Sequence, residues 1–213
     1  DQLMLEVRLV NSKRGIWVAN VPAQLLARPG DNPWPGITAL LTGTLIALKV
    51  LTQTGGKDDE RFGREVDVLV GLEHPHIVRY VAHGRVPGGQ PFLAMEWVDG
   101  CSLAERIGQG VLDVHETIVM AIGIAGALGR AHGQGIVHRD VKPSNLFLVE
   151  WQPARTTLLD FGVARFAALP RLTASGLAVG TPLFMAPEQA RGGREVDARA
   201  DVFGLGAVLY RCL

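Results

Sequence analysis

The sequence has little cysteine and no excess of charge of either sign. Its 213 residues include only two cysteines, Cys101 and Cys212, which lie far apart in the chain and do not suggest a disulfide scaffold. We interpret both as small buried hydrophobic residues in a reducing compartment. Lysine plus arginine and aspartate plus glutamate each total 21, so no overall charge attracts nucleic acid or an anionic membrane.

Long hydrophobic runs are also missing. The longest nearly uncharged apolar run covers residues 118–129, which is too short to cross a bilayer, and no signal peptide is visible. We therefore expect a cytoplasmic protein with no membrane segment in this chain. The sequence begins at Asp1 without methionine and stops at Leu213 inside the apolar helical pattern FGLGAVLYRCL, so we expect a C-terminally truncated part of a longer protein.

What the sequence does contain is a group of chemically active side chains in IVHRDVKPSN, residues 136–145. Asp140 could accept a proton from a hydroxyl group, and Lys142 could neutralise charge on a phosphoryl group. Asn145 could give a neutral oxygen to Mg²⁺, a cation that prefers oxygen ligands. For any one of these residues alone, a charged surface turn between a helix and a strand would be the better interpretation.

A second carboxylate is predicted to lie near this segment. The apolar stretches LFLV (146–149) and TTLLD (156–160) are separated by EWQPAR, whose proline and polar residues predict a β-hairpin. Such a hairpin would bring Asp160 close to Asn145 at the strand ends.

HRDVKPSN, DFG and MAPE, in this order and spacing, resemble the motifs of eukaryotic-like serine/threonine protein kinases of the bacterial type. The resemblance implies an α+β, two-lobed protein kinase-like fold. Residues 1–98 would form a small antiparallel β lobe with one helix, and residues 99–213 a mainly helical large lobe that is incomplete. It also implies transfer of the γ-phosphoryl group of Mg²⁺-bound ATP to serine or threonine hydroxyls of protein substrates.

The resemblance assigns roles to the motif residues. Asp140 would orient and deprotonate the acceptor hydroxyl, with Lys142 and Thr181 as catalytic support. Asn145 and Asp160 would coordinate Mg²⁺. The lysine after HRD favours serine and threonine over tyrosine acceptors.

The nucleotide site would be formed mainly by the small lobe. Lys49 lies on the apolar face of a predicted strand (44–51) and needs an anion, because burying an unpaired ammonium group is costly. Glu65, at the edge of the apolar stripe of a predicted helix (58–72), matches the family's partner for this lysine. By resemblance Lys49 holds the α- and β-phosphates, and the backbone of Glu96 and Val98 pairs with adenine.

One motif departs from the family pattern. The turn between the predicted strands 3–10 and 16–21 should be a glycine-rich loop that approaches the phosphates, but only Gly15 matches, with Val10 and Ser12 at the other glycine positions. This departure leaves open a pseudokinase, a signalling or scaffold module with weakened nucleotide binding. A small-molecule phosphotransferase of related fold is disfavoured by GTPLFMAPE, which shapes the peptide-binding surface in protein kinases.

Two further segments carry predictions about regulation. Residues 22–43 form an insertion rich in proline and glycine, which either packs on the small lobe or docks a partner. By similarity to bacterial kinases, the residues between Asp160 and Glu188 form the activation segment. Thr173 and Ser175 within it are predicted autophosphorylation sites. A phosphate there could pair with Arg139.

Two helices of the large lobe have sequence signals of their own. Asp113 followed by Glu116 resembles a capping box, and the apolar helix after it is predicted to end near Gly133. Asp201 is predicted to begin the central helix of the large lobe and to hold the backbone of the catalytic loop, residues 136–145. Glu188 is expected to lack its usual arginine partner from a later helix.

Overall fold

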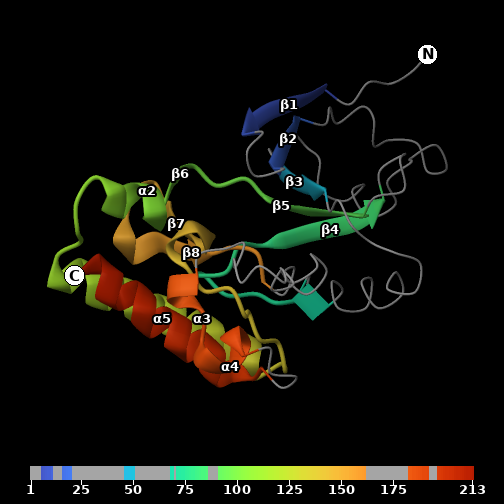
Figure 1. Cartoon of the computed structure of the whole chain (residues 1–213). Helices are drawn as coiled ribbons and strands as arrows, with labels where there is room; N and C mark the ends of the chain where they lie inside the picture. The colour runs from blue at the N-terminus through green and yellow to red at the C-terminus, as the bar shows by residue number, and fades with distance from the viewer. Residues whose placement is uncertain are drawn as a thin grey trace, which may run out of the picture. The chain divides into compact units, whose positions relative to one another are not determined.

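A computed structural model describes residues 6–11, 16–20, 46–50, 68–69, 71–85, 91–161, 182–191 and 196–213 (Figure 1). The chain divides into two compact units. The first consists of residues 1–73 and 79–97, and the second of residues 74–78 and 98–213. The insertion at 22–43 and nearly all of the predicted helix 58–72 lie outside the described residues.

The first unit contains a five-stranded antiparallel sheet with the strand order β1-β2-β3-β5-β4. The strands are β1 (Glu6–Asn11), β2 (Ile16–Asn20), β3 (Ile46–Val50), β4 (Tyr80–Arg85) and β5 (Pro91–Glu96). β5 is flanked by strands on both sides, and its residues 92–95 are all buried, as expected for a central strand. The strands predicted at 3–10, 16–21 and 44–51 are confirmed where the structure describes them, and the first ends at Asn11.

The second unit is mainly helical and includes a small three-stranded sheet of order β6-β7-β8. Its regular elements, in chain order, are β6 (Gly100–Ser102), α2 (Leu103–Gly108), α3 (Val114–His132), η3 (Pro143–Asn145), β7 (Leu146–Val149), η4 (Pro153–Arg155), β8 (Thr156–Leu158), η6 (Pro182–Phe184), α4 (Pro187–Ala190) and α5 (Ala198–Cys212). β7 and β8 pair antiparallel, which confirms the predicted hairpin.

Helix α3 begins at the predicted capping box. The Asp113 side chain accepts a hydrogen bond from the backbone of Glu116, whose own side chain accepts one from the backbone of Asp113. The helix ends at His132, with Gly133 as its C-cap, close to the predicted end. By length and composition α3 could also cross a membrane. The side chains of Met120 and Ile124 are nevertheless almost fully buried within the second unit, as in the core helix of a globular protein.

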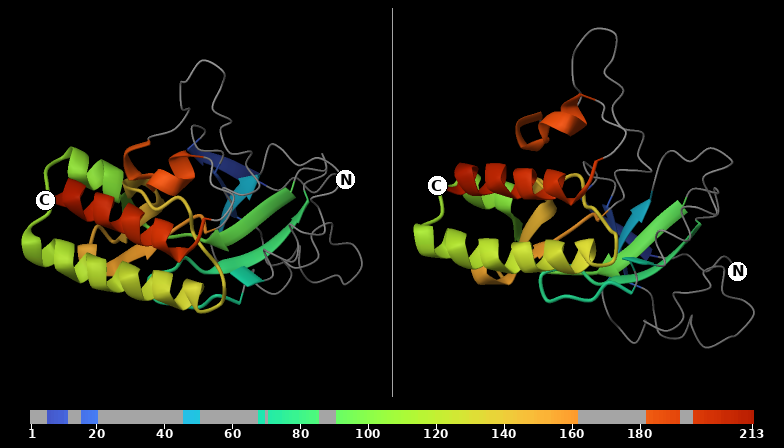
Figure 2. Two further views of the ribbon diagram at one scale, coloured as in Figure 1. Left: turned by 60° about the horizontal axis from the view of Figure 1, so that its bottom comes forward. Right: turned by 90° about the horizontal axis from the view of Figure 1, so that it is seen from below.

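Helices α3 and α5 lie side by side along the second unit (Figure 2). α5 begins at Ala198, with Asp197 rather than Asp201 as its N-cap, so the predicted start of this helix is corrected by one turn. Gly204 lets α5 pass close to the catalytic loop, because a Cβ atom there would lie 3.0 Å from the carbonyl oxygen of Val141. The other end of α5 is tied down by the Leu112 amide, which donates to the carbonyl of Cys212.

The segment 74–78 belongs to the second unit although the sheet strands on either side of it in sequence belong to the first. The backbone amide of Val78 donates to the carbonyl of Leu158, and the amide of Leu158 donates to the carbonyl of His76. This hydrogen-bonded segment extends the β7–β8 hairpin by a parallel bridge between Ile77 and Leu158.

The two cysteines are both free thiols in this structure. Cys212 is buried in α5, and burial raises the pKa of its thiol to about 11. Cys101 is only half-buried, so the prediction of a buried residue is confirmed for Cys212 and is too strong for Cys101.

Candidate active site

Three of the predicted catalytic side chains meet in the loop between α3 and β7. Lys142 Nζ lies 2.5 Å from Asp140 Oδ2. Asn145 Nδ2 donates to the carbonyl oxygen of Asp140 at 2.8 Å and to its Oδ2 at 3.0 Å. The side chain of Asp140 is 38% exposed, so its carboxylate is fixed by two neighbours yet remains open to an incoming hydroxyl group.

Asp160 follows β8 and is linked to this cluster through the backbone. The amide of Leu159 donates to the carbonyl oxygen of Asn145 at 2.9 Å. The predicted hairpin therefore brings the residue before Asp160 into contact with Asn145. Asp160 itself has a φ of 63°, in the left-handed region that non-glycine residues seldom adopt, and such strain is found preferentially at functional sites.

The side chains of Asn145 and Asp160 are chemically suited to Mg²⁺. The amide nitrogen of Asn145 is used by Asp140, so the group that Asn145 can offer a cation is its amide oxygen. Asp160 adds a carboxylate, and hard divalent cations such as Mg²⁺ prefer oxygen donors of these two types. Within the described residues no group of three or more histidine, cysteine or acidic side chains suggests a different metal site.

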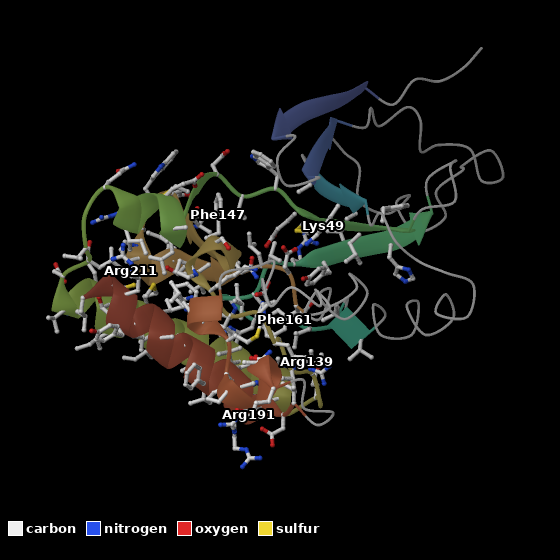
Figure 3. All side chains as sticks on the ribbon, viewed as in Figure 1. Lys49, Arg139, Phe147, Phe161, Arg191 and Arg211 are labelled. Carbon is white, nitrogen blue, oxygen red and sulfur yellow. The ribbon has the colours of Figure 1, made fainter. Side chains whose placement is uncertain are left out.

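His138 joins the two halves of this site. Its Nδ1 accepts from the backbone amide of Asp140 at 3.2 Å, and its Nε2 lies 2.8 Å from the carbonyl oxygen of Leu159. These partners fix the tautomer, because an atom that accepts an amide proton carries none and the other nitrogen must donate. The ring also packs edge-on against fully buried Phe161 at 4.8 Å, which Figure 3 labels.

Asp201, in the first turn of α5, holds the backbone of the loop. Its Oδ2 accepts from the amide of His138 at 2.8 Å, and its Oδ1 accepts from the amide of Arg139 at 2.7 Å. His132, in the last turn of α3, lies 2.7 Å from Oδ2 through its Nε2. With an exposure of 1%, Asp201 satisfies otherwise buried donors, and the prediction that it holds the loop backbone is confirmed.

His138 and His132 were not singled out by the sequence analysis. His138 stands in the HRD motif itself, whose order alone could have drawn attention to it. His132 had a weaker signal, a polar ring next to buried Ala131 in a helix whose buried residues are mostly apolar. Nothing local in the sequence connects His132 with Asp201, because they are 69 residues apart.

The remaining predicted site residues fall in the first unit or outside the described residues. Lys49 lies on β3, half-buried on the same face as buried Ala47 and opposite Leu93 of β5 (Figure 3). Glu96 ends β5, where its carboxylate accepts from the amide of Arg79. Val98 follows at the start of the long stretch of the second unit. Gly15, Glu65, Thr173, Ser175 and Thr181 lie outside the described residues, so their assigned roles stay predictions.

Glu188 lies in α4. Among the described residues it has no ion pair within 4.0 Å, and Arg199 at the start of α5 is a nearby positive charge.

His74 and His76, in the segment 74–78, pack against α3. His76 Nδ1 lies 2.8 Å from the carbonyl oxygen of Thr156, and the amide of His76 donates to His74 Nδ1. A Cβ atom on Gly123 would lie 2.6 Å from the His76 ring, so the glycine makes room for it. Burial, followed by the charges of His76 and Arg130, lowers the pKa of His74. These contacts tie the segment 74–78 to β8 and α3.

One unit carries a sheet with a lysine on its third strand, and the other carries an Asp–Lys–Asn loop hydrogen-bonded to the residue before Asp160. These are the parts expected of a protein kinase domain. Residues 37–213 match the Protein kinase domain family, and the chain therefore belongs to that family. The fold predicted from the sequence motifs is thereby confirmed.

Bacterial serine/threonine kinases are similar over most of the chain. Serine/threonine-protein kinase PknK of Mycobacterium tuberculosis is 38% identical over 209 residues, which cover 92% of this chain and 18% of PknK. PknD of the same organism is 43% identical over 154 residues, 72% of this chain and 23% of PknD. Serine/threonine-protein kinase pkn3 of Myxococcus xanthus is 34% identical over 179 residues, 79% of this chain and 32% of pkn3. The chain thus spans less than a third of each of these relatives.

A solved structure shows the same fold. The crystal structure of Rad53 1-466 in complex with AMP-PNP superposes with a TM-score of 0.69 and 23% sequence identity, covering 98% of this chain and 48% of that one. At this identity the similarity supports the fold alone.

Proposed function

We propose that this protein is a serine/threonine kinase that transfers the γ-phosphoryl group of Mg²⁺-bound ATP to hydroxyl groups of protein substrates. The observation that carries the proposal is the cluster around Asp140. Lys142 and Asn145 both contact its carboxylate, and the Leu159–Asn145 hydrogen bond ties it to the segment bearing Asp160. This arrangement supplies a base, a cation and two oxygen donors, which are the parts that phosphoryl transfer requires.

The reaction assigns each group a step. Asp140 accepts the proton of the substrate hydroxyl, whose oxygen forms a bond to the γ-phosphorus as the bond to the ADP oxygen breaks. Lys142, already beside Asp140, offsets negative charge on the moving phosphoryl group. Bound Mg²⁺ supplies charge neutralisation of the phosphates, and Asn145 and Asp160 are the residues that would hold it.

Residues away from this cluster complete the proposal by family resemblance. Lys49, paired with Glu65, holds the α- and β-phosphates beside the loop containing Gly15, and the backbone of Glu96 and Val98 holds adenine. Thr181 supports catalysis. Thr173 and Ser175 are proposed sites of autophosphorylation, the insertion at 22–43 is a proposed docking segment, and the protein acts in the cytoplasm.

A catalytically silent pseudokinase is the second candidate. One observation favours it: the turn that should carry three glycines has only Gly15, so fewer backbone amides can approach the phosphates. The retained catalytic residues favour the active enzyme, because a scaffold needs neither a general base nor metal ligands.

The test is phosphate incorporation with Mg²⁺ and ATP, followed by intact mass and by phosphopeptide mapping, using the full-length protein and a generic protein acceptor. Asp140→Asn should reduce transfer by about 100-fold or more, because the general base is lost, while nucleotide binding measured by calorimetry is retained. Asp113→Asn is the matched control, since it makes the same change at an exposed helix cap that tolerates asparagine.

Three outcomes separate the candidates. Transfer by the wild type and the control, but not by Asp140→Asn, supports the kinase. If Asp140→Asn lost binding and transfer together, the role given to Asp140 would be wrong. A well-folded wild type that binds nucleotide yet adds no phosphate would support the pseudokinase.

A further inference from the structure

Gln189, in α4, bridges two parts of the second unit that are distant in sequence. Its Nε2 donates to the carbonyl oxygen of Arg139 at 2.8 Å, and its Oε1 accepts from the amide of Ala186 at 3.1 Å. The two partners fix the orientation of the side-chain amide, because only the nitrogen can donate to a carbonyl and only the oxygen can accept from an amide. Gln189 therefore ties the first turn of α4 to the catalytic loop.

The carbonyl that Gln189 holds belongs to the peptide that leads directly into Asp140. The amide end of this same peptide, Asp140 N, donates to His138 Nδ1. Gln189 thus fixes one side of the Arg139–Asp140 peptide and His138 the other. A peptide held at both its oxygen and its nitrogen cannot rotate without losing a hydrogen bond.

The Arg139–Asp140 peptide follows a residue with a strained backbone. Arg139 has a φ of 68°, in the left-handed region, which is unfavourable for a residue with a Cβ atom and persists only where the surroundings enforce it. Asp201 holds the amide before it, through Arg139 N. If the carbonyl contact were absent, the strained residue could relax by turning the peptide, and the Asp140 side chain would turn with it.

We propose that Gln189 is a positioning residue for phosphoryl transfer, which keeps the Asp140 carboxylate aimed at the acceptor hydroxyl by anchoring the Arg139 carbonyl to α4. This inference rests on the proposed kinase function. The position of α4 would then affect catalysis, because a displacement of α4 would move Asp140 through the Gln189 side chain. Lys142 and Asn145 contact Asp140 itself, at its carboxylate and its carbonyl oxygen, whereas Gln189 holds the peptide bond that precedes Asp140.

Two substitutions separate the two hydrogen bonds of Gln189. Gln189→Glu keeps an oxygen for the amide of Ala186 but turns a second oxygen, in place of the donor, toward the Arg139 carbonyl. Gln189→Met, of similar length, removes both hydrogen bonds. Gln152→Glu, on the exposed turn before η4, is the matched control for the change of charge.

The first readout is steady-state phosphorylation of a protein acceptor, with kcat and the KM for ATP determined separately. For Gln189→Glu we expect kcat to fall about tenfold, which corresponds to about 1.4 kcal/mol and is within the range for one lost hydrogen bond. The KM for ATP should change less than about twofold, because the lost contact affects the base rather than the nucleotide. Gln189→Met should show a similar fall. If Gln189→Glu kept the kcat of the wild type while Gln189→Met lost it, the side chain would only secure α4 and the proposal would be overturned.

The second readout is amide hydrogen exchange, which does not require catalysis. Both Gln189 variants should speed exchange in a peptide covering residues 138–142, while exchange in the middle of α3 stays unchanged. Unchanged exchange at 138–142 would overturn the positioning role even if kcat fell. If the wild type transferred no phosphate, the kinase function would fail, and the exchange experiment would still decide whether Gln189 holds the loop.

Discussion

Removing the Asp201 carboxylate should destabilise the second unit more than any other single acidic substitution among its described residues. Asp201→Ala leaves the buried amides of His138 and Arg139 without their acceptor. An unsatisfied buried donor costs about 1–3 kcal/mol, so the two amides together predict a loss of about 2–6 kcal/mol in the free energy of unfolding. That is a large part of the total stability of an ordinary domain, which is about 5–15 kcal/mol.

The assay is urea denaturation followed by circular dichroism, with Asp197→Ala as the matched control. Both residues lie at the start of α5, but Asp197 is an exposed N-cap whose side chain is 54% accessible and pairs with Arg199. Asp197→Ala should lower the free energy of unfolding by the smaller amount expected for the loss of an N-cap. Asp201→Asn should fall between the two, since its NH2 group replaces one of the two acceptor oxygens and leaves the backbone amide that faces it without an acceptor. Equal losses for Asp201→Ala and Asp197→Ala would refute the view that the buried carboxylate holds the loop.

Two further predictions concern α3 and the histidines that pack on it. Gly123→Ala should lower the free energy of unfolding by about 1–3 kcal/mol, because the new methyl group would collide with the His76 ring and force it away from Thr156. Gly129→Ala, in the same helix with no atom within 4 Å of the added methyl, should instead raise stability by about 0.5–1 kcal/mol through helix propensity; equal effects in thermal denaturation would contradict the packing argument. The lowered pKa of His74 means that the unfolded chain takes up a proton more readily than the folded one, so stability should fall as the pH drops through 6.5, the ordinary pKa of histidine. His74→Gln should lessen this acid-dependent loss when unfolding is measured at pH 7.5 and 5.5, whereas the same change at exposed His115 should not; identical slopes for the two variants would show that His74 does not contribute.

Local signals in the sequence were sufficient to predict the individual elements near the site. The capping box at Asp113, the hairpin after Asn145 and the strand around Lys49 each depend on residues within a few positions of one another. Hydrogen-bonding side chains at a helix start and alternating apolar residues in a strand act over that short range. The motif order then indicated the family, which the match over residues 37–213 confirmed.

The arrangement of the catalytic loop could not be predicted in the same way. Its strained backbone at Arg139 is held by Asp201, a role that the kinase resemblance predicted, and by Gln189, which the sequence analysis did not single out. These residues lie 62 and 50 residues later in the chain. The segment 74–78 joins the second unit by hydrogen bonds to Leu158, and no local sequence pattern predicts that these two segments pair. Such contacts exist only after distant elements have packed.

The sequence by itself therefore determined which chemical groups this protein has and which local elements carry them. Composition excluded a disulfide scaffold, and the motifs that contain Asp140, Lys142, Asn145 and Asp160 implied phosphoryl transfer through their resemblance to protein kinases. Only the tertiary structure decided the further contacts that keep those groups in place: the His138 tautomer, the pairing of His132 with the Asp201 carboxylate and the Gln189 bridge. The physical reason is that a buried polar group takes whichever partner the packing of the core brings to it, and that partner is not specified by the residues beside it in the chain.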